Sequence, residues 1–305
     1  MHVRSTATGL EVLAPAKLNL FLEVLGKRDD GFHEIETLMV PIGLFDTLHF
    51  QLDPSGRIVL DCRTTSPYGG TASPYGVMGE QLPAGSENIV VRAVDLVRRR
   101  FAVPQGARVR LIKRIPMAAG MAGGSSDAAA ALVAICHLWE LSLSFEQLSQ
   151  LAEELGSDVP FFLGRGAAVC RGRGERLEPV AGLGNLWFVV VKPPEGLSTA
   201  DVYRACHPAE RPRRVEALIE ALRAGRLARA GAGLRNALQP AAETLSPWVR
   251  RLSREFASLD CLGHQMSGSG TSYFGLCRHA RHARRVAACL RARGVGQCYA
   301  VQGTN

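Results

Sequence analysis

The residues with the clearest chemical potential lie in a glycine-rich and alanine-rich stretch, PMAAGMAGGSSDAAAAL, at positions 116–132. Its three glycines allow the backbone to turn N–H groups toward a ligand, and a helix that begins after them would attract an anion. Ser125 and Ser126 can cap that helix or offer hydroxyls to a phosphate or to Mg²⁺. The stretch is therefore a candidate phosphate-binding loop. Small residues that only let a helix pack close to a strand remain an alternative.

Two common phosphate-binding motifs do not fit this stretch. No GK[ST] follows the glycines, which excludes a Walker A loop. The spacing of Gly120, Gly123 and Gly124 is wrong for a dinucleotide fingerprint, and no strand ending in an acidic residue follows about 20 residues later.

The N-terminal part of the chain predicts strands. Residues 10–26, LEVLAPAKLNLFLEVLG, alternate so that Lys17 and Asn19 share a face with Phe21 and Glu23, and we expect this face to be wet. The sequence GKRDDG predicts a hairpin turn, and residues 32–52 predict one or two further strands.

Alternating helices and strands follow. Residues 86–101 predict a helix capped by Ser86 or Asn88, and residues 107–115 predict a strand. The helix after the glycines has apolar residues at helical spacing, which predicts one buried face. Residues 144–156 predict an amphipathic helix that stops at Gly156. Near residue 178 a new succession of strands and helices begins, which predicts a domain boundary.

Composition limits the classes of protein. A chain of 305 residues suits two domains, and neither a signal peptide nor a membrane span is evident, so we expect a cytoplasmic protein without a membrane partner. The eight cysteines are scattered without zinc spacing and are expected to be reduced packing residues. The net charge of +8 is mostly explained by a solvated helix face around Arg278, Arg281 and Arg285, so no nucleic-acid partner is expected. The repeated SPYG within residues 63–80 predicts an inserted loop of unknown purpose.

Four segments together resemble a known family. The stretch 116–132 is similar to the second motif of the GHMP kinases, which binds the ATP triphosphate. APAKLNLFLEVLGKRDDGFHEIETLM is similar to the N-terminal motif of the 4-diphosphocytidyl-2-C-methyl-D-erythritol kinase family, within that superfamily. LGSDVPFFLGRGAAVCRGRGE and MSGSGTSYFGL agree with it in the family's order.

The resemblance implies an α+β fold of two domains. Residues 1–178 would form a ribosomal-S5-like N-terminal domain with a left-handed βαβ unit, and residues 179–305 a ferredoxin-like C-terminal domain, with the site between them. The implied reaction transfers the ATP γ-phosphoryl to the 2-hydroxyl of 4-diphosphocytidyl-2-C-methyl-D-erythritol, with Mg²⁺ accompanying ATP. No carboxylate cage for the metal is evident in the sequence, and the oligomeric state is left open.

The family match singles out two catalytic candidates. Asp158 follows a helix stop beside Val159 and Pro160 and is the best candidate for the base, with an ordinary loop cap as the alternative. Lys17 can polarise the hydroxyl, keep Asp158 ionised or bind the transferring phosphoryl; these roles stay open.

The binding residues follow from the same motifs. For ATP they are Asn88, Pro116, Met117, Ala118, Ala119, Gly120, Met121, Ala122, Gly123, Gly124, Ser125 and Ser126. For the substrate they are Asn19, Phe32, His33, Tyr203, Gly268, Ser269, Gly270 and Thr271. Some of them have a plainer alternative: Asn88 as an N-cap, Asn19 as an exposed strand residue, Phe32 and His33 as core residues, and 268–271 as a hairpin turn.

Two positions depart from the family pattern, Met121 in place of Leu and Phe32 in place of Tyr. The first conserves volume, and the second keeps a stacking face but loses a hydroxyl. Two rival hypotheses remain, a GHMP kinase with another substrate and a non-catalytic ligand sensor on the same fold. The sensor would be expected to lose Lys17 or Asp158, and both are present.

Overall fold

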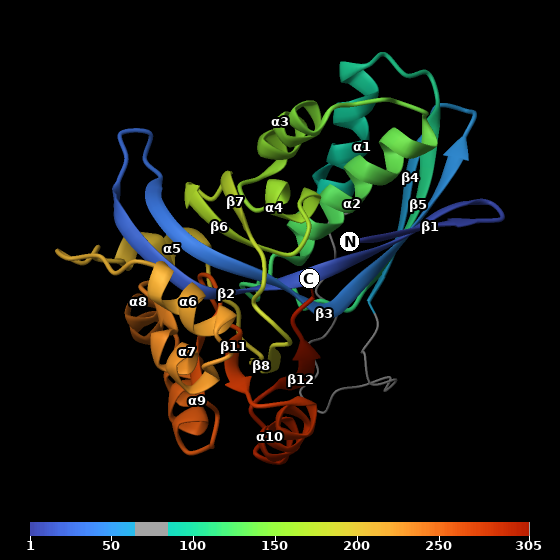
Figure 1. The fold of residues 1–305 in the computed structure, drawn as a ribbon. Coiled ribbons are helices and arrows are strands. Elements are labelled where there is room, and N and C mark those ends of the chain that lie inside the picture. The colour runs from blue at the N-terminus through green and yellow to red at the C-terminus, as the bar shows by residue number, and fades with distance from the viewer. Residues whose placement is uncertain (65–84, 305) are drawn as a thin grey trace. The chain divides into compact units, whose positions relative to one another are not determined.

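The computed structural model describes residues 1–64 and 85–304, which divide into two compact units interleaved along the chain (Figure 1). Unit 1 consists of Met1–Ala16, Leu44–Met117 and Ala122–Arg165; unit 2 consists of Lys17–Gly43, Ala118–Met121 and Gly166–Asn305. Almost all of the predicted SPYG loop lies outside the described residues. The predicted boundary near residue 178 stays a prediction.

Two long strands run through both units. Strand β2 spans Gly9–Lys27 and strand β3 spans His33–Asp53. The turn between them closes where the Arg28 amide donates to the Phe32 carbonyl at 2.8 Å, as the sequence GKRDDG predicted. The region from residue 32 onward forms one strand, where the sequence allowed one or two.

Among its described residues, unit 1 combines a parallel strand pair with four α-helices. Its further elements are β1 (His2–Thr6), β4 (Ile58–Thr64), η1 (Gly85–Glu87), α1 (Ile89–Arg100), β5 (Gly106–Lys113), α2 (Gly123–Leu138), α3 (Phe145–Leu155) and α4 (Val159–Leu163). β1 pairs antiparallel with the start of β2, and β5 pairs antiparallel with the end of β3, from Thr47↔Ile112 to Asp53↔Gly106. β4 pairs parallel with β5, and α1 lies between them in the chain.

The helices of unit 1 begin and end at the predicted signals. Asn88 caps α1 by accepting from the Val90 amide at 2.9 Å, and Ser144 and Gln147 form a capping box at the start of α3. Gly156 ends α3, as predicted. Helix α2 differs from its prediction, because residues 126–132 are all buried and not only one face. The reason is that α1, α3 and α4 all pack against it (Figure 1).

Unit 2 contains an antiparallel four-stranded sheet in the order β10-β11-β8-β12. Its elements beyond β2 and β3 are β6 (Ala167–Gly172), β7 (Arg176–Val180), β8 (Trp187–Lys192), α5 (Thr199–Ala205), α6 (Glu216–Arg223), α7 (Leu227–Gly233), β9 (Arg235–Asn236), α8 (Gln239–Leu245), α9 (Pro247–Ala257), β10 (Gly263–Met266), β11 (Tyr273–Cys277), α10 (Ala280–Ala292) and β12 (Gln297–Gln302). Strand β6 pairs with β3 and β7, and β9 pairs parallel with β2.

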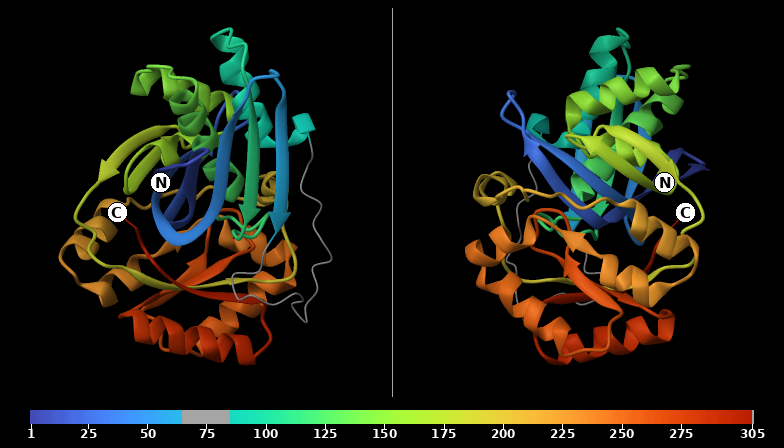
Figure 2. Two further views of the ribbon diagram at one scale, coloured as in Figure 1. Left: turned by 90° about the vertical axis from the view of Figure 1, so that its right-hand side faces the viewer. Right: turned by 60° about the vertical axis from the view of Figure 1, so that its left-hand side comes forward.

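Helices α9 and α10 pack against this sheet (Figure 2). The core between them includes Val189 and Val191 of β8, Phe256 of α9 and Val286 of α10, all fully buried. The opposite face of α10 carries the exposed Arg281 and its neighbours, so the prediction of a solvated basic helix face is confirmed. All eight cysteines are free, and most of them are buried, as expected.

Candidate functional site

Lys17 and Asn19 lie side by side on β2 in unit 2. The Lys17 Nζ donates to Asn19 Oδ1 at 2.6 Å and to the Gly120 carbonyl at 3.2 Å. Asn19 Nδ2 donates in turn to Thr37 Oγ1 at 2.8 Å. Both side chains are almost fully buried, with exposed fractions of 3% and 1%.

The prediction that this face of β2 is wet was wrong. Phe21 and Glu23 on the same face are also buried, and the Glu23 carboxylate is paired with Arg235 of β9. A buried charge needs such a partner, because desolvation is costly without one. Neighbouring elements of unit 2 therefore cover the polar face and fix its side chains.

A turn of the glycine-rich stretch lies against Lys17. The Met121 carbonyl accepts from the Lys17 amide at 3.1 Å, and Ser267 Oγ donates to the Gly120 carbonyl at 3.0 Å. A Cβ added to Gly120, whose φ is +68°, would lie 2.1 Å from the Ser267 carbonyl oxygen. Only glycine fits at this point of close approach.

The backbone of this stretch is turned repeatedly. Ala118, Gly120 and Ala122 have φ values of +45°, +68° and +52°. Positive φ is uncommon for alanine, and outliers of this kind gather at ligand sites. Alternation with left-handed residues also gathers N–H groups into anion-binding concavities. This geometry favours the phosphate-binding alternative for the stretch.

The second glycine loop, residues 267–272, connects β10 and β11, as its hairpin alternative predicted. A Cβ on Gly268 would lie 3.3 Å from Asn19 Oδ1 and 3.4 Å from Lys17 Nζ, so this loop borders the same pair. Ser269 Oγ is 2.8 Å from Thr199 Oγ1, and Thr271 Oγ1 donates to the Glu195 carbonyl at 2.6 Å.

Sequence reasoning missed Asn236, which holds this loop in place. Its Nδ2 donates to the Met266 and Gly268 carbonyls, both at 2.8 Å, and its Oδ1 accepts from the Leu238 amide at 2.9 Å. The asparagine in the run LRNALQP was the only available signal.

In unit 1, helix α2 begins directly at Gly123 and has Ala122 as its N-cap residue. The prediction that Ser125 or Ser126 caps this helix was wrong, because both lie inside its first turn. Gly124 is exposed, and a Cβ there would meet nothing closer than 3.9 Å. A Cβ on Gly123 would lie 2.8 Å from Ile115 Cγ2, so Gly123 is required for packing.

A buried ionic cluster, which the sequence analysis missed, lies beneath this first turn. Lys113 Nζ donates to Asp127 Oδ2 at 2.7 Å and to Asp46, whose other oxygen accepts from the Arg114 and Ile115 amides. Burial raises the pKa of the Asp127 carboxyl well above its ordinary value, against the opposing effect of Lys113. Ser126 Oγ and Asp127 Oδ1 are buried without a hydrogen-bond partner.

Asp158 lies between α3 and α4 in unit 1. It occupies the N-cap position of α4 but makes no side-chain capping hydrogen bond, so the alternative of an ordinary cap was wrong. Pro160 in the first turn of α4 limits the backbone freedom around it. The short helix α4 was not among the elements expected from the sequence.

The three aromatic candidates lie in unit 2. The rings of His33 and Tyr203 have centroids 5.2 Å apart and an interplanar angle of 33°. Phe32 is half exposed, at 50%. Burial, followed by the charge of Lys27, lowers the pKa of His33, which favours the neutral imidazole. The alternative that Phe32 is a core residue was wrong.

No group of three or more His, Cys, Asp or Glu side chains in residues 1–64 and 85–304 is arranged to hold a metal ion. No helix in this part of the chain is long and apolar enough to cross a bilayer.

Comparison with known proteins shows the family to which the chain belongs. The family model of the GHMP kinases N terminal domain matches residues 88–166, and that of the GHMP kinases C terminal domain matches residues 218–296. The 4-diphosphocytidyl-2-C-methyl-D-erythritol kinase of Pelotomaculum thermopropionicum is 45% identical over 284 residues, covering 92% of this chain and 94% of that protein. The chain belongs to the 4-diphosphocytidyl-2-C-methyl-D-erythritol kinase family of GHMP kinases.

Solved structures agree with this placement. A crystal structure of 4-(cytidine 5'-diphospho)-2C-methyl-D-erythritol kinase is 38% identical, with a TM-score of 0.77 over 97% of this chain and 100% of that one. Homoserine kinase from Cytophaga hutchinsonii, 19% identical with a TM-score of 0.73 over 100% and 98% of the two chains, shares the fold alone. The predicted α+β GHMP kinase fold is confirmed, and the chain is a small-molecule kinase.

Proposed function

We propose that this kinase transfers the γ-phosphoryl group of ATP to the 2-hydroxyl of 4-diphosphocytidyl-2-C-methyl-D-erythritol, giving the 2-phosphate and ADP in non-mevalonate isoprenoid biosynthesis. The observation that carries the proposal is the buried Lys17–Asn19 pair, bordered by two glycine turns, in a chain 45% identical to a kinase of that name. A cytoplasmic location follows from this role.

Lys17 supplies the fixed positive charge of the proposed mechanism. Phosphoryl transfer spreads negative charge over the equatorial oxygens of the moving group, and a preorganised cation stabilises that charge. Asn19 and the Gly120 carbonyl orient the ammonium group. Asp158, which precedes the first turn of α4, takes the proton from the attacking hydroxyl.

ATP binds through the stretch 116–126, with Asn88 reaching the adenine. The backbone turns at Ala118, Gly120 and Ala122 support this role, since they gather N–H groups for the phosphates. The donor set of the described residues does not form a resident metal centre. We therefore propose that Mg²⁺ arrives with ATP and neutralises part of its charge.

The substrate binds through its base and its diphosphate. Phe32 and Tyr203 would stack on the cytosine ring, and the neutral His33 imidazole can both donate to and accept from its edge. The loop at residues 268–271, next to Lys17 in unit 2, would approach the diphosphate.

A coupled assay of ADP release tests the proposal. The purified protein should turn over with 4-diphosphocytidyl-2-C-methyl-D-erythritol, and ³¹P NMR should show a new phosphomonoester on the tertiary carbon. Homoserine and mevalonate serve as the competing substrates. Turnover with either of these and none with the cytidine compound would refute the proposal.

A further inference from the structure

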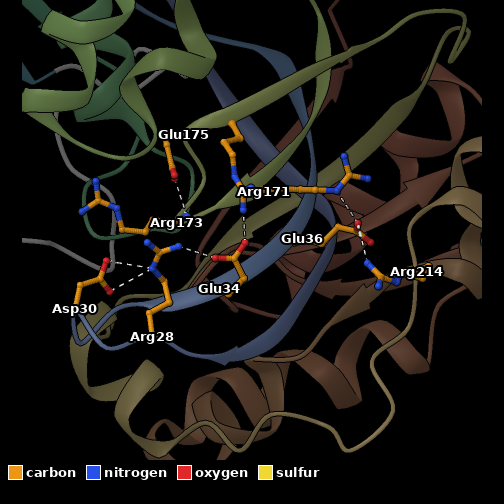
Figure 3. A network of polar contacts seen from close by, with 9 residues as sticks. Arg28, Asp30, Glu34, Glu36, Arg171, Arg173, Glu175 and Arg214 are labelled. Carbon is orange, nitrogen blue, oxygen red and sulfur yellow. Dashed lines mark hydrogen bonds and ion pairs between the residues drawn. The ribbon is translucent and has the colours of Figure 1, made fainter.

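A network of arginines and carboxylates joins two turns of unit 2 (Figure 3). The first turn is the β2–β3 connection, and the second, RGRGER, is the β6–β7 connection. Four ion pairs define the network: Arg28–Glu34 at 2.7 Å, Arg171–Glu36 at 2.9 Å, Arg214–Glu36 at 3.7 Å and Arg176–Glu34. The two turns are therefore held against each other on both sides of residues 172–175.

Arg173 lies at the tip of the second turn and, among the described residues, contacts an aromatic ring instead of forming an ion pair. Its guanidinium makes no ion pair with a carboxylate among residues 1–64 and 85–304, and in Figure 3 it points away from Glu34 and Glu36. Its carbon Cζ lies 4.8 Å from the centroid of the Phe32 ring, within the range of a cation–π contact. The Phe32 ring is therefore the group that the Arg173 guanidinium contacts directly, while its charge also helps to lower the pKa of Asp30.

The backbone around Arg173 is fixed. The Arg173 amide donates to Glu175 Oε2 at 2.6 Å. Gly172 has a φ of +76°, and a Cβ there would lie 2.4 Å from Glu175 Oε1. With Arg171 and Arg176 anchored by carboxylates on either side, the backbone from which the Arg173 side chain projects is held in place.

Both the backbone and the ring of Phe32 make contacts that hold the residue in place. Its amide donates to Asp30 Oδ1 at 3.1 Å, and its carbonyl accepts from the Arg28 amide at 2.8 Å. Arg173 covers part of the ring, which nevertheless stays 50% exposed. A large apolar ring that is fixed but half exposed is suited to receive a flat ligand on its uncovered face.

We propose that Arg173 is a positioning residue for nucleobase recognition: it holds the Phe32 ring from one face, so that the opposite face stacks on the pyrimidine of the substrate. His33 follows Phe32 in the chain, and the Tyr203 ring lies against that of His33, with centroids 5.2 Å apart. This inference rests on the proposed function, because it assigns Arg173 to the base of that substrate.

Steady-state kinetics of Arg173→Ala test the proposal. An exposed cation–π contact corresponds to about a two- to fivefold change in affinity, so the KM for the cytidine substrate should rise by that factor. The kcat and the KM for ATP should stay within about twofold. Arg173→Lys keeps a cation for the ring and should recover most of the loss. Arg229→Ala removes an exposed charge of unit 2 elsewhere and should leave all three constants unchanged.

A double-mutant cycle separates positioning from direct contact. In a Phe32→Ala background, Arg173→Ala should have almost no further effect, because the ring on which it acts is gone. An undiminished effect in that background, or an Arg173→Ala variant indistinguishable from Arg229→Ala, overturns the proposal. So does an Arg173→Lys variant as weak as Arg173→Ala.

Calorimetry with CDP keeps this test independent of the catalytic proposal. If the wild-type protein does not phosphorylate the cytidine substrate, the proposed function fails. Equal CDP affinities of the wild type and Arg173→Ala would then overturn the role of Arg173 as well, whereas weaker binding that depends on Phe32 would support it.

Discussion

The ammonium group of Lys17 donates to the side-chain carbonyl of Asn19 at 2.6 Å, and neither side chain reaches solvent to any extent. A cation and an amide two residues apart on a strand project from the same face, which brings them together here. The ammonium group also donates to the Gly120 carbonyl at 3.2 Å. Lys17 is therefore preorganised, and its charge requires little rearrangement to act on a phosphoryl group.

Replacing Lys17 by Met should abolish most catalysis. The variant keeps the length of the side chain but removes the charge, so kcat should fall by about two orders of magnitude or more, as for loss of an oriented electrostatic donor. The assay of ADP release measures this effect. Lys27→Met, at the exposed end of the same strand, is the matched control and should leave kcat nearly unchanged. A Lys17→Met enzyme with normal kcat would remove Lys17 from the mechanism.

Asp158→Asn tests the proposed base. The amide cannot take the hydroxyl proton, so turnover should fall by roughly two or more orders of magnitude, while the dissociation constant of ATP stays nearly the same. Because Asp158 makes no capping hydrogen bond, the helix α4 should be unaffected, and circular dichroism can check this. Near-normal turnover would contradict the role as base.

The features predicted correctly from the sequence depend on neighbours in the chain. Ser144 and Gln147 signal the start of α3 by their spacing, and Asn88 signals that of α1, because capping needs only residues two or three positions apart. The β2–β3 turn was predicted for the same reason, because it also depends on residues that are close together in the chain.

The features that were missed depend on distant residues. Glu23 was expected in solvent, but Arg235, more than 200 positions away, neutralises it in the interior. Asn236 looked like any polar residue until its carbonyl partners at Met266 and Gly268 were known. Alternation along one strand cannot show which face another segment will cover.

Gly124→Ala separates phosphate binding from packing in the glycine-rich stretch. A Cβ at Gly124 would meet nothing closer than Ile89 Cγ2 at 3.9 Å, an ordinary van der Waals contact, so the variant should fold with unchanged or slightly higher stability. If backbone N–H groups approach phosphate there, ATP binding should weaken by about tenfold, measured by calorimetry. Gly123→Ala is the contrasting variant, which should lose stability through its clash with Ile115. Unchanged ATP affinity in Gly124→Ala would favour packing as the function of the glycines.

The KM for the cytidine substrate should depend on pH through His33. Its pKa is lowered, so the imidazole is neutral at pH 7 and becomes protonated only below the ordinary histidine range of about 6.5. Protonation removes the acceptor nitrogen, so this KM should be flat from about pH 7 to 8 and should rise only below the ordinary histidine range. His33→Asn should have a higher KM without that rise. The KM for ATP serves as the internal control, and a parallel rise in it would assign the titration to another group.

Lys113→Met should be the most destabilising of these substitutions. Lys113 is the shared partner of Asp46 and Asp127, all three with exposed fractions of 5% or less. Removing it leaves two buried carboxyl groups without their cation, which typically costs about 3–5 kcal/mol of unfolding free energy. Urea denaturation followed by circular dichroism measures this loss. Arg110→Met, an exposed arginine on the same strand, should change the unfolding free energy by less than about 0.5 kcal/mol. A Lys113→Met protein as stable as Arg110→Met would show that protonation of the two carboxyl groups suffices to keep them buried, and that the lysine does not stabilise the first turn of α2.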